Sequence, residues 1–196
     1  MDALAELPDH TKRLLALLQA IENIPEPDFT AVEPSKRPDE KLWEGLPDFA
    51  NSWADTSYRS GSWKMDADAT SGAERDALRD DHVRRAQVEA QLVMAGLAGI
   101  PIDWGYEVIT DALESDEALL DFEVPAAAEW FVVCGQRIRQ GAREGEKSYA
   151  FKDKSLSLEQ WSMWQTQLRK LQAHSGVVQC AATKALAAMH EAEAGS

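Results

Sequence analysis

The sequence predicts an all-α protein, a single domain of about seven or eight helices over residues 1–196. In most segments apolar residues recur every three or four positions, which is the period of one face of an α-helix. No segment alternates polar and apolar residues for long enough to indicate a half-buried strand. Prolines and glycines separate the periodic segments, and the chain is long enough for one core of ordinary size.

The first two predicted helices flank a proline-rich connection. Residues 9–24 carry leucines and an isoleucine at helical spacing, and a proline ends this stripe. Four prolines follow within residues 25–41, where each removes a backbone donor and disfavours helix in the residue before it. We therefore expect an extended connection that either wraps the surface or is mobile. A short helix is expected over residues 47–58, with Trp53 available to face inward.

A long helix is predicted after a polar loop. Residues 61–72 are polar and are expected to form a loop around Trp63. Ser71 and Glu74 then match a capping box, in which each side chain satisfies a free backbone donor near the other residue. The helix that follows is expected to run to Leu97, because a glycine and a proline come soon after it.

The central helix is predicted from composition. A helix over residues 103–113 precedes it, and Pro125 opens it, since proline is favoured at the first helical position. Residues 126–134 are nearly all apolar, and a helix that is apolar on every side is buried. Residues 141–156 follow as a charged loop, either solvated or a lid over an anionic ligand.

Two amphipathic helices end the predicted fold. Ser157 and Gln160 repeat the capping-box spacing, and apolar residues then recur at helical spacing as far as Leu171. After a turn at Gly176, small residues repeat every four positions over residues 177–192. Small side chains allow close approach, so these two helices are expected to pack together.

Charge excludes two classes of partner. The chain has 34 acidic and 20 basic side chains, a net charge of −14, which repels nucleic-acid phosphates and anionic membranes.

No run approaches the roughly 20 apolar residues of a membrane-spanning helix, and the first residues are acidic where a signal peptide needs basic ones. Two cysteines are too few for a disulfide-stapled secreted scaffold. We therefore expect a cytoplasmic protein with neither a nucleic-acid nor a membrane partner.

Familiar cofactor motifs do not occur in the sequence. There is no glycine-rich phosphate loop and no dinucleotide fingerprint. The four histidines do not pair at metal-ligand spacing, although ligands could converge from distant helices. We expect neither a cofactor nor a metal.

Three ionisable residues interrupt apolar helix faces and are the candidate catalytic residues. His82 and Glu89 lie on nearly the same face of one helix and could act as an acid–base pair. The alternative is a hydrogen-bonded core histidine beside a glutamate that reaches solvent. Glu129 lies in the most apolar helix, where a carboxylate is either paired with a lysine or arginine or serves as a functional acid.

The seven tryptophans are the most unusual feature of the composition. Four of them lie near loops or short elements, where tryptophan can line a cavity for an apolar ligand or anchor an interface. The alternative is that they close the ends of a small helical domain. The candidate ligand-binding residues are these four and the tryptophan of the central helix: Trp43, Trp53, Trp63, Trp104 and Trp130.

Short stretches of sequence also carry a family resemblance. They are Leu42-Trp43-x-x-Leu46-Pro47 followed by Trp53, Ala95-Gly96-Leu97, and Val124-Pro125-Ala126-Ala127-Ala128-Glu129-Trp130. Over about residues 40–140 the chain resembles a family of uncharacterised helical proteins of filamentous fungi, a domain of unknown function. The family brings no catalytic residues. Its relatives occur near secondary-metabolite genes, so the resemblance implies an accessory enzyme such as a cofactor-free cyclase or isomerase.

Two functional hypotheses follow. The first is a cofactor-independent enzyme or binding protein for an apolar small molecule, most concretely a cyclase or pericyclase of fungal secondary metabolism. It would hold one reactive conformer in a tryptophan-lined cavity, while Glu129 or His82 polarises a carbonyl or moves a proton. The alternative is a non-catalytic helical interaction module, which could form a homodimer.

Overall fold

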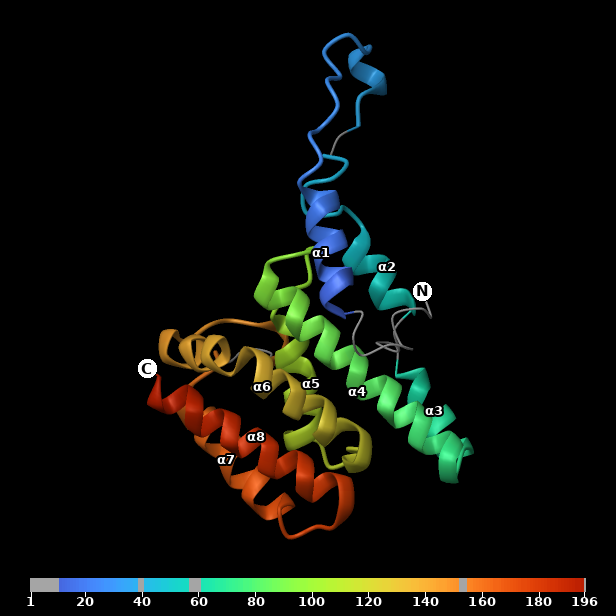
Figure 1. Cartoon of the computed structure of the whole chain (residues 1–196). Helices are drawn as coiled ribbons and strands as arrows, with labels where there is room; N and C mark the ends of the chain where they lie inside the picture. The colour runs from blue at the N-terminus through green and yellow to red at the C-terminus, as the bar shows by residue number, and fades with distance from the viewer. Residues whose placement is uncertain (1–10, 39–40, 57–60, 152–154, 196) are drawn as a thin grey trace.

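The computed structural model describes residues 11–38, 41–56, 61–151 and 155–195. Eight α-helices account for most of them, and no strand occurs in these ranges beyond one isolated bridge (Figure 1). The predicted all-α class is therefore confirmed. The helices are α1 (Thr11–Glu22), α2 (Phe49–Thr56), α3 (Ser62–Ala69), α4 (Gly72–Ala95), α5 (Asp103–Glu114), α6 (Leu120–Glu144), α7 (Leu158–Leu171) and α8 (Gly176–Ala194).

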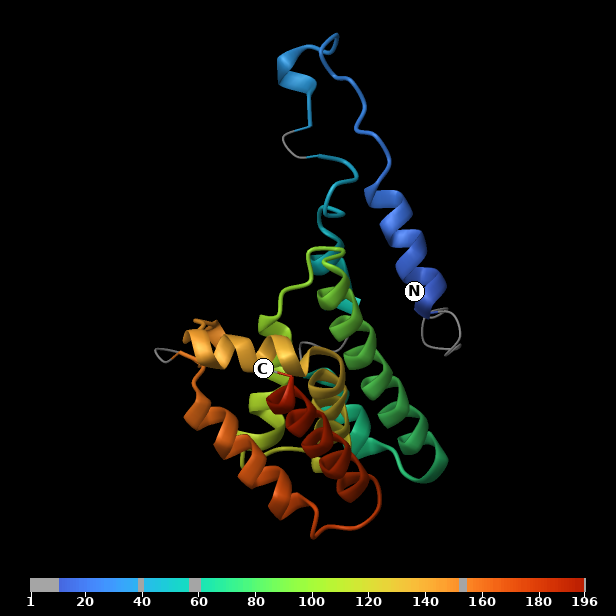
Figure 2. The same cartoon turned by 60° about the vertical axis from the view of Figure 1, so that its left-hand side comes forward.

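Helix α6 is the centre of the fold, as predicted. It contacts α4, α5, α7 and α8, and it lies between α4 and α8 in both views (Figures 1 and 2). Phe131, Cys134 and Ile138 occupy successive turns of α6 and are buried. Because residues 126–134 of α6 are nearly all apolar, this part of the helix is stable only when other helices surround it.

The bounds of α6 correct two predictions. The helix begins at Leu120, so Pro125 lies in its second turn instead of opening it. The proline forgoes one backbone hydrogen bond, and the burial of Phe122 and Val124 offsets that loss. At the other end α6 continues to Glu144, so the predicted charged loop is shorter than residues 141–156 and contains a 3-10 helix, Tyr149–Phe151.

The segment 61–72, predicted to be a loop, contains helix α3. Its sequence is polar, but Trp63 and Ala67 lie one turn apart and are both buried against Phe122. Tertiary burial of this pair, which local composition does not reveal, stabilises the helix.

Of the two predicted capping boxes, one is half formed, because the Gln160 side chain donates to Glu114 of α5 and does not complete the box. The Ser157 hydroxyl accepts the backbone N–H of Gln160 at 3.2 Å at the start of α7. Helix α4 begins directly after Ser71 as predicted, but the Ser71 side chain makes no capping hydrogen bond. This helix ends two residues before the predicted Leu97, because Gly96 adopts the left-handed conformation that closes many helices.

The proline-rich connection projects from the helical body. We call residues 23–38 and 41–48 the arm; it points away from α4–α8 in both views (Figures 1 and 2). At its base the Glu26 carboxylate accepts the backbone N–H groups of residues 42, 43 and 44 at 2.9, 2.8 and 3.1 Å. Glu22 accepts the N–H of Ala98 at 2.7 Å, which ties the end of α1 to the turn after α4. The connection therefore does not wrap the surface.

Candidate functional site

The three predicted catalytic residues lie in three different places. Glu89 of α4 is buried and accepts the indole N–H of Trp53 at 2.8 Å. This contact attaches α2 to α4. The carboxylate that the sequence suggested for acid–base chemistry thus has a partner within the protein.

His82 of α4 is packed among aromatic rings. Its ring centroid lies 4.2 Å from that of Trp63 and 6.0 Å from that of Phe122. Burial lowers the pKa of His82 to about 4, and the positive charge of Arg85 adds to this effect. Glu89 lies seven residues further along the same helix, about 10 Å along its axis. His82 and Glu89 therefore each contact a different tryptophan and do not form a pair with each other.

Glu129 of α6 has a charged partner on α8. One carboxylate oxygen accepts from the Lys184 ammonium at 2.6 Å. The other oxygen is buried and has no hydrogen-bond partner among the described residues. Of the two alternatives that the sequence left open, the structure shows the ion pair.

Four of the five candidate ligand-binding tryptophans are buried in the core. They are Trp53, Trp63, Trp104 and Trp130, whereas Trp43 is half-buried at the base of the arm. Trp130 packs flat against Gly105, where an added Cβ would come within 2.8 Å of its ring atoms. The two cavities described below have no tryptophan in their walls.

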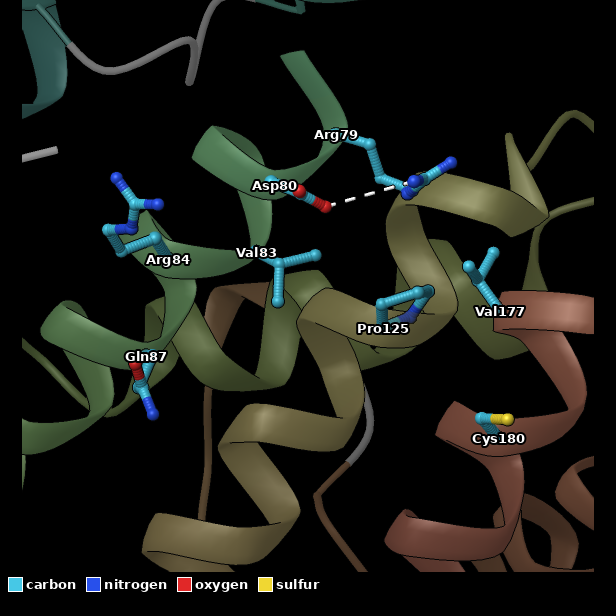
Figure 3. Close-up of a pocket in the computed structure, with 8 residues that line it drawn as sticks. All are labelled: Arg79, Asp80, Val83, Arg84, Gln87, Pro125, Val177 and Cys180. Atoms are coloured by element: carbon cyan, nitrogen blue, oxygen red, sulfur yellow. Dashed lines mark ion pairs between the residues drawn. The ribbon is translucent and has the colours of Figure 1, made fainter. Parts of the chain in front are cut away.

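A groove between α4, α6 and α8 is the candidate site (Figure 3). Its volume is about 410 Å³. Val83 of α4 and Val177 of α8 lie on either side of Pro125 of α6 and form an apolar floor with Cys180 (Figure 3). The rim is polar and comes from α4. We call this the α4–α6–α8 groove, and its rim residues are Arg79, Asp80, Arg84 and Gln87.

Two arginines make the rim locally cationic. Arg79 extends from α4 toward α6, with one guanidinium nitrogen 2.9 Å from Asp76 and another 3.8 Å from Asp80 (Figure 3). Arg84 makes no hydrogen bond or ion pair with any residue in the described ranges. The lining contains one carboxylate, that of Asp80. In a chain of net charge −14, this surface differs in sign from the average.

A second cavity, of about 830 Å³, lies between α5, α7 and the 3-10 helix Tyr149–Phe151. Eight of its eleven lining residues are polar or charged. Glu114 of α5, which lines it, accepts from the Trp164 indole and from the Gln160 amide, each at 2.8 Å. This carboxylate therefore holds α7 against α5. The other walls include Thr110, Asp111, Ser115, Ser155, Ser157, Glu159 and Met163.

Sequence reasoning missed the groove residues. Arg79, Val83 and Gln87 recur every four positions on α4, so periodicity could have placed them on one helix face. Val177 and Cys180 come from a helix about a hundred residues further along the chain. No local signal indicates which face of α8 meets which face of α4.

Two further properties of the described residues bear on function. None of the helices in these ranges is both long enough and apolar enough to cross a bilayer. The same residues contain no group of three or more histidine, cysteine or acidic side chains that could hold a metal ion.

Comparison with known families matches residues 1–168 to a protein family of unknown function, DUF3632. The chain belongs to this family. The match ends within α7, so Val177, Cys180 and Lys184 of α8 follow the part that aligns with DUF3632. No curated protein and no solved structure matches the chain.

Proposed function

We propose that this protein is a cofactor-independent binding protein for an apolar small molecule, which it holds in the α4–α6–α8 groove. One observation carries the proposal: three helices border an open groove of about 410 Å³ with an apolar floor, and this volume is within the usual range of ligand pockets. The resemblance to a fungal family suggests that the ligand belongs to secondary metabolism. The cytoplasm is the location that we propose from the acidic first residues and the absence of a long apolar run.

The geometry supports binding more directly than catalysis. Glu89, His82 and Glu129 each contact an internal partner, and none of them lines the groove. A cyclase or isomerase activity would therefore rest on holding one conformer of the ligand, which contributes orientation entropy without a reacting side chain.

Cys180 offers a direct probe of occupancy. It is exposed and lines the groove, whereas Cys134 is buried, so a maleimide should alkylate Cys180 first. We expect 1-decanol, used as a simple apolar ligand, to slow this alkylation in a concentration-dependent way, as measured by intact mass. A Cys180→Ser variant should remain unmodified on the same timescale. An alkylation rate that decanol leaves unchanged would count against the proposal.

Two substitutions to aspartate test the apolar floor. Val83→Asp places a charge in the groove, whereas Leu158→Asp places one at an exposed position of α7, a helix that does not line it. We expect the first variant to lose decanol binding and the second to keep it, in calorimetric titrations of the full chain. Equal binding by both variants would place the ligand elsewhere.

A specific observation also favours the interaction module as a second candidate function. The arm and the helices at its base expose large apolar side chains that the helical body does not cover. These are Leu17 at 56%, Ile24 at 43%, Leu42 at 40% and Met94 at 52%. Exposed apolar side chains that gather in one region often mark a protein interface. In this proposal the partner is a second copy of the chain.

Sedimentation velocity tests the second candidate. We expect the full chain to form a concentration-dependent dimer, and Leu42→Asp to shift it to the monomer. Met65→Asp is the matched control, because Met65 is 76% exposed on α3, away from the arm. A monomer at all concentrations, or equal loss of dimer in both variants, would remove this candidate.

A further inference from the structure

We infer that the ligand of the α4–α6–α8 groove is an amphipathic anion, an apolar molecule with one carboxylate, and that Arg84 binds the carboxylate. This inference rests on the proposed function and adds the chemical class of the ligand. The pairing of the arginines is the observation behind it.

Arg84 differs from every other half-buried arginine in the described ranges. Five of the six have a carboxylate within 4 Å: Arg75 with Asp121, Arg79 with Asp76, Arg85 with Asp81, Arg137 with Glu146 and Arg139 with Glu193. Arg84 has no such partner there, although 34 acidic side chains are present in the chain. A guanidinium that loses part of its hydration without gaining a counter-charge is unfavourable. An anionic ligand would supply that counter-charge.

The chemistry of the groove fits both ends of such a ligand. Guanidinium groups present planar N–H pairs that match the two oxygens of a carboxylate. Arg84, Val83 and Pro125 lie in that order across the groove, so the cationic rim borders the apolar floor along its α4 edge (Figure 3). Pro125 has no backbone N–H, and the floor side chains of α4 and α8 are aliphatic or a thiol. The head group is therefore bound at the rim and the chain lies across the floor.

Local charge is needed because the protein as a whole repels anions. With a net charge of −14, long-range attraction favours cations. The groove carries two arginines against one aspartate, and Arg79 already contacts two aspartates. Arg84 is accordingly the residue whose charge is left for a ligand.

A pair of ligands that differ only in charge tests the inference. Decanoate and 1-decanol have the same chain length, and both can be titrated into the full-length protein by calorimetry. We expect decanoate to bind more tightly than decanol. Arg84→Gln should weaken decanoate binding by about three- to tenfold and leave decanol binding unchanged, because only the charged contact is lost. Arg84→Lys should restore part of the decanoate affinity.

A control variant and the pattern of binding distinguish a wrong ligand class from a wrong binding site. Arg143→Gln, at an exposed position in the last turn of α6, removes the same charge away from the groove and should bind decanoate like the parent. If decanoate and decanol bind equally, or if Arg84→Gln weakens both equally, the anionic class is wrong while the groove remains a binding site. If neither binds and neither protects Cys180 from alkylation, both the inference and the proposed function fail.

Discussion

The indole N–H of Trp53 donates to the Glu89 carboxylate at 2.8 Å, and both residues are only 5% exposed. Two other tryptophans repeat this relationship between helices. Trp164 of α7 donates to Glu114 of α5, and Trp161 of α7 donates to Glu193 of α8 at 3.0 Å. Tryptophan in this fold thus combines a large buried surface with a hydrogen bond that fixes one helix against another.

Removing one indole N–H should show how much a hydrogen bond from tryptophan to glutamate contributes to the free energy of unfolding. Trp53→Phe deletes the donor to Glu89, whereas Trp130→Phe deletes an indole N–H that has no partner among the described residues. Both variants lose similar volume from a buried site. We expect Trp53→Phe to be the less stable by about 1–2 kcal/mol in urea unfolding, because a buried carboxylate loses a hydrogen bond. Equal losses would show that the bond contributes nothing measurable.

The Glu129–Lys184 pair should be asymmetric in its response to mutation. Lys184→Ala leaves a buried carboxylate without its counter-charge and should destabilise the fold by about 1–2 kcal/mol, since the lysine is partly exposed. Glu129→Gln removes the charge itself and should cost less. In the Glu129→Gln background, Lys184→Ala should have little further effect, as a double-mutant cycle would measure. Additive losses in that cycle would contradict a direct coupling between the two residues.

Stability should depend on the protonation of His82. Burial lowers its pKa in the folded protein to about 4, below its ordinary value of 6.5. The unfolded chain therefore binds the proton more readily, so the contribution is fully present above pH 6.5 and is lost as the pH falls from 6.5 to 4. The loss amounts to at most about 3 kcal/mol. Urea midpoints measured at pH 7 and pH 4.5 give this difference.

His82→Gln provides the variant for that experiment. It removes the titrating group, so the pH dependence between 7 and 4.5 should flatten. His190→Gln, at an exposed position of α8, should keep the profile of the parent protein. A profile that is as steep in His82→Gln as in the parent would assign the pH dependence to other groups.

Two glycines of α6 should respond oppositely to alanine. A Cβ at Gly141 would collide with the Glu146 carboxylate and come within 2.7 Å of the Tyr106 hydroxyl. These two groups share a hydrogen bond of 2.9 Å, and Arg137 binds the same carboxylate. Gly141→Ala should therefore destabilise the protein by about 1–3 kcal/mol.

Gly135→Ala is the matched control in the same helix. Its nearest neighbour to an added Cβ is the Ala188 carbonyl oxygen at 3.6 Å, an ordinary contact. We expect a gain of about 0.5–1 kcal/mol, because alanine favours the helix and fits the space. Thermal unfolding of both variants would measure these two changes in stability. A gain in stability from Gly141→Ala would show that Glu146 and its partners can move aside.

Helices whose sequence signals lie within one or two turns were predicted accurately, and a helix that depends on contacts between distant residues was not. Helices α5 and α7 were predicted within a residue or two, because apolar spacing and the Ser157 cap act over one or two turns. Helix α3 was missed, since its polar sequence is helical through the burial of Trp63 against His82 and Phe122. Those partners lie 19 and 59 residues further along the chain.

The sequence by itself determined the helical class, the central place of α6 and the set of unusual residues, because period and composition are local properties of the chain. Only the tertiary structure decided which partners those residues have. Glu129 could have paired with any of 20 basic side chains, and helix packing brought Lys184 to it. The groove arises in the same way, from one face each of α4, α6 and α8. Periodicity defines each face separately, but the contact between faces depends on how the helices cross, which no single segment encodes.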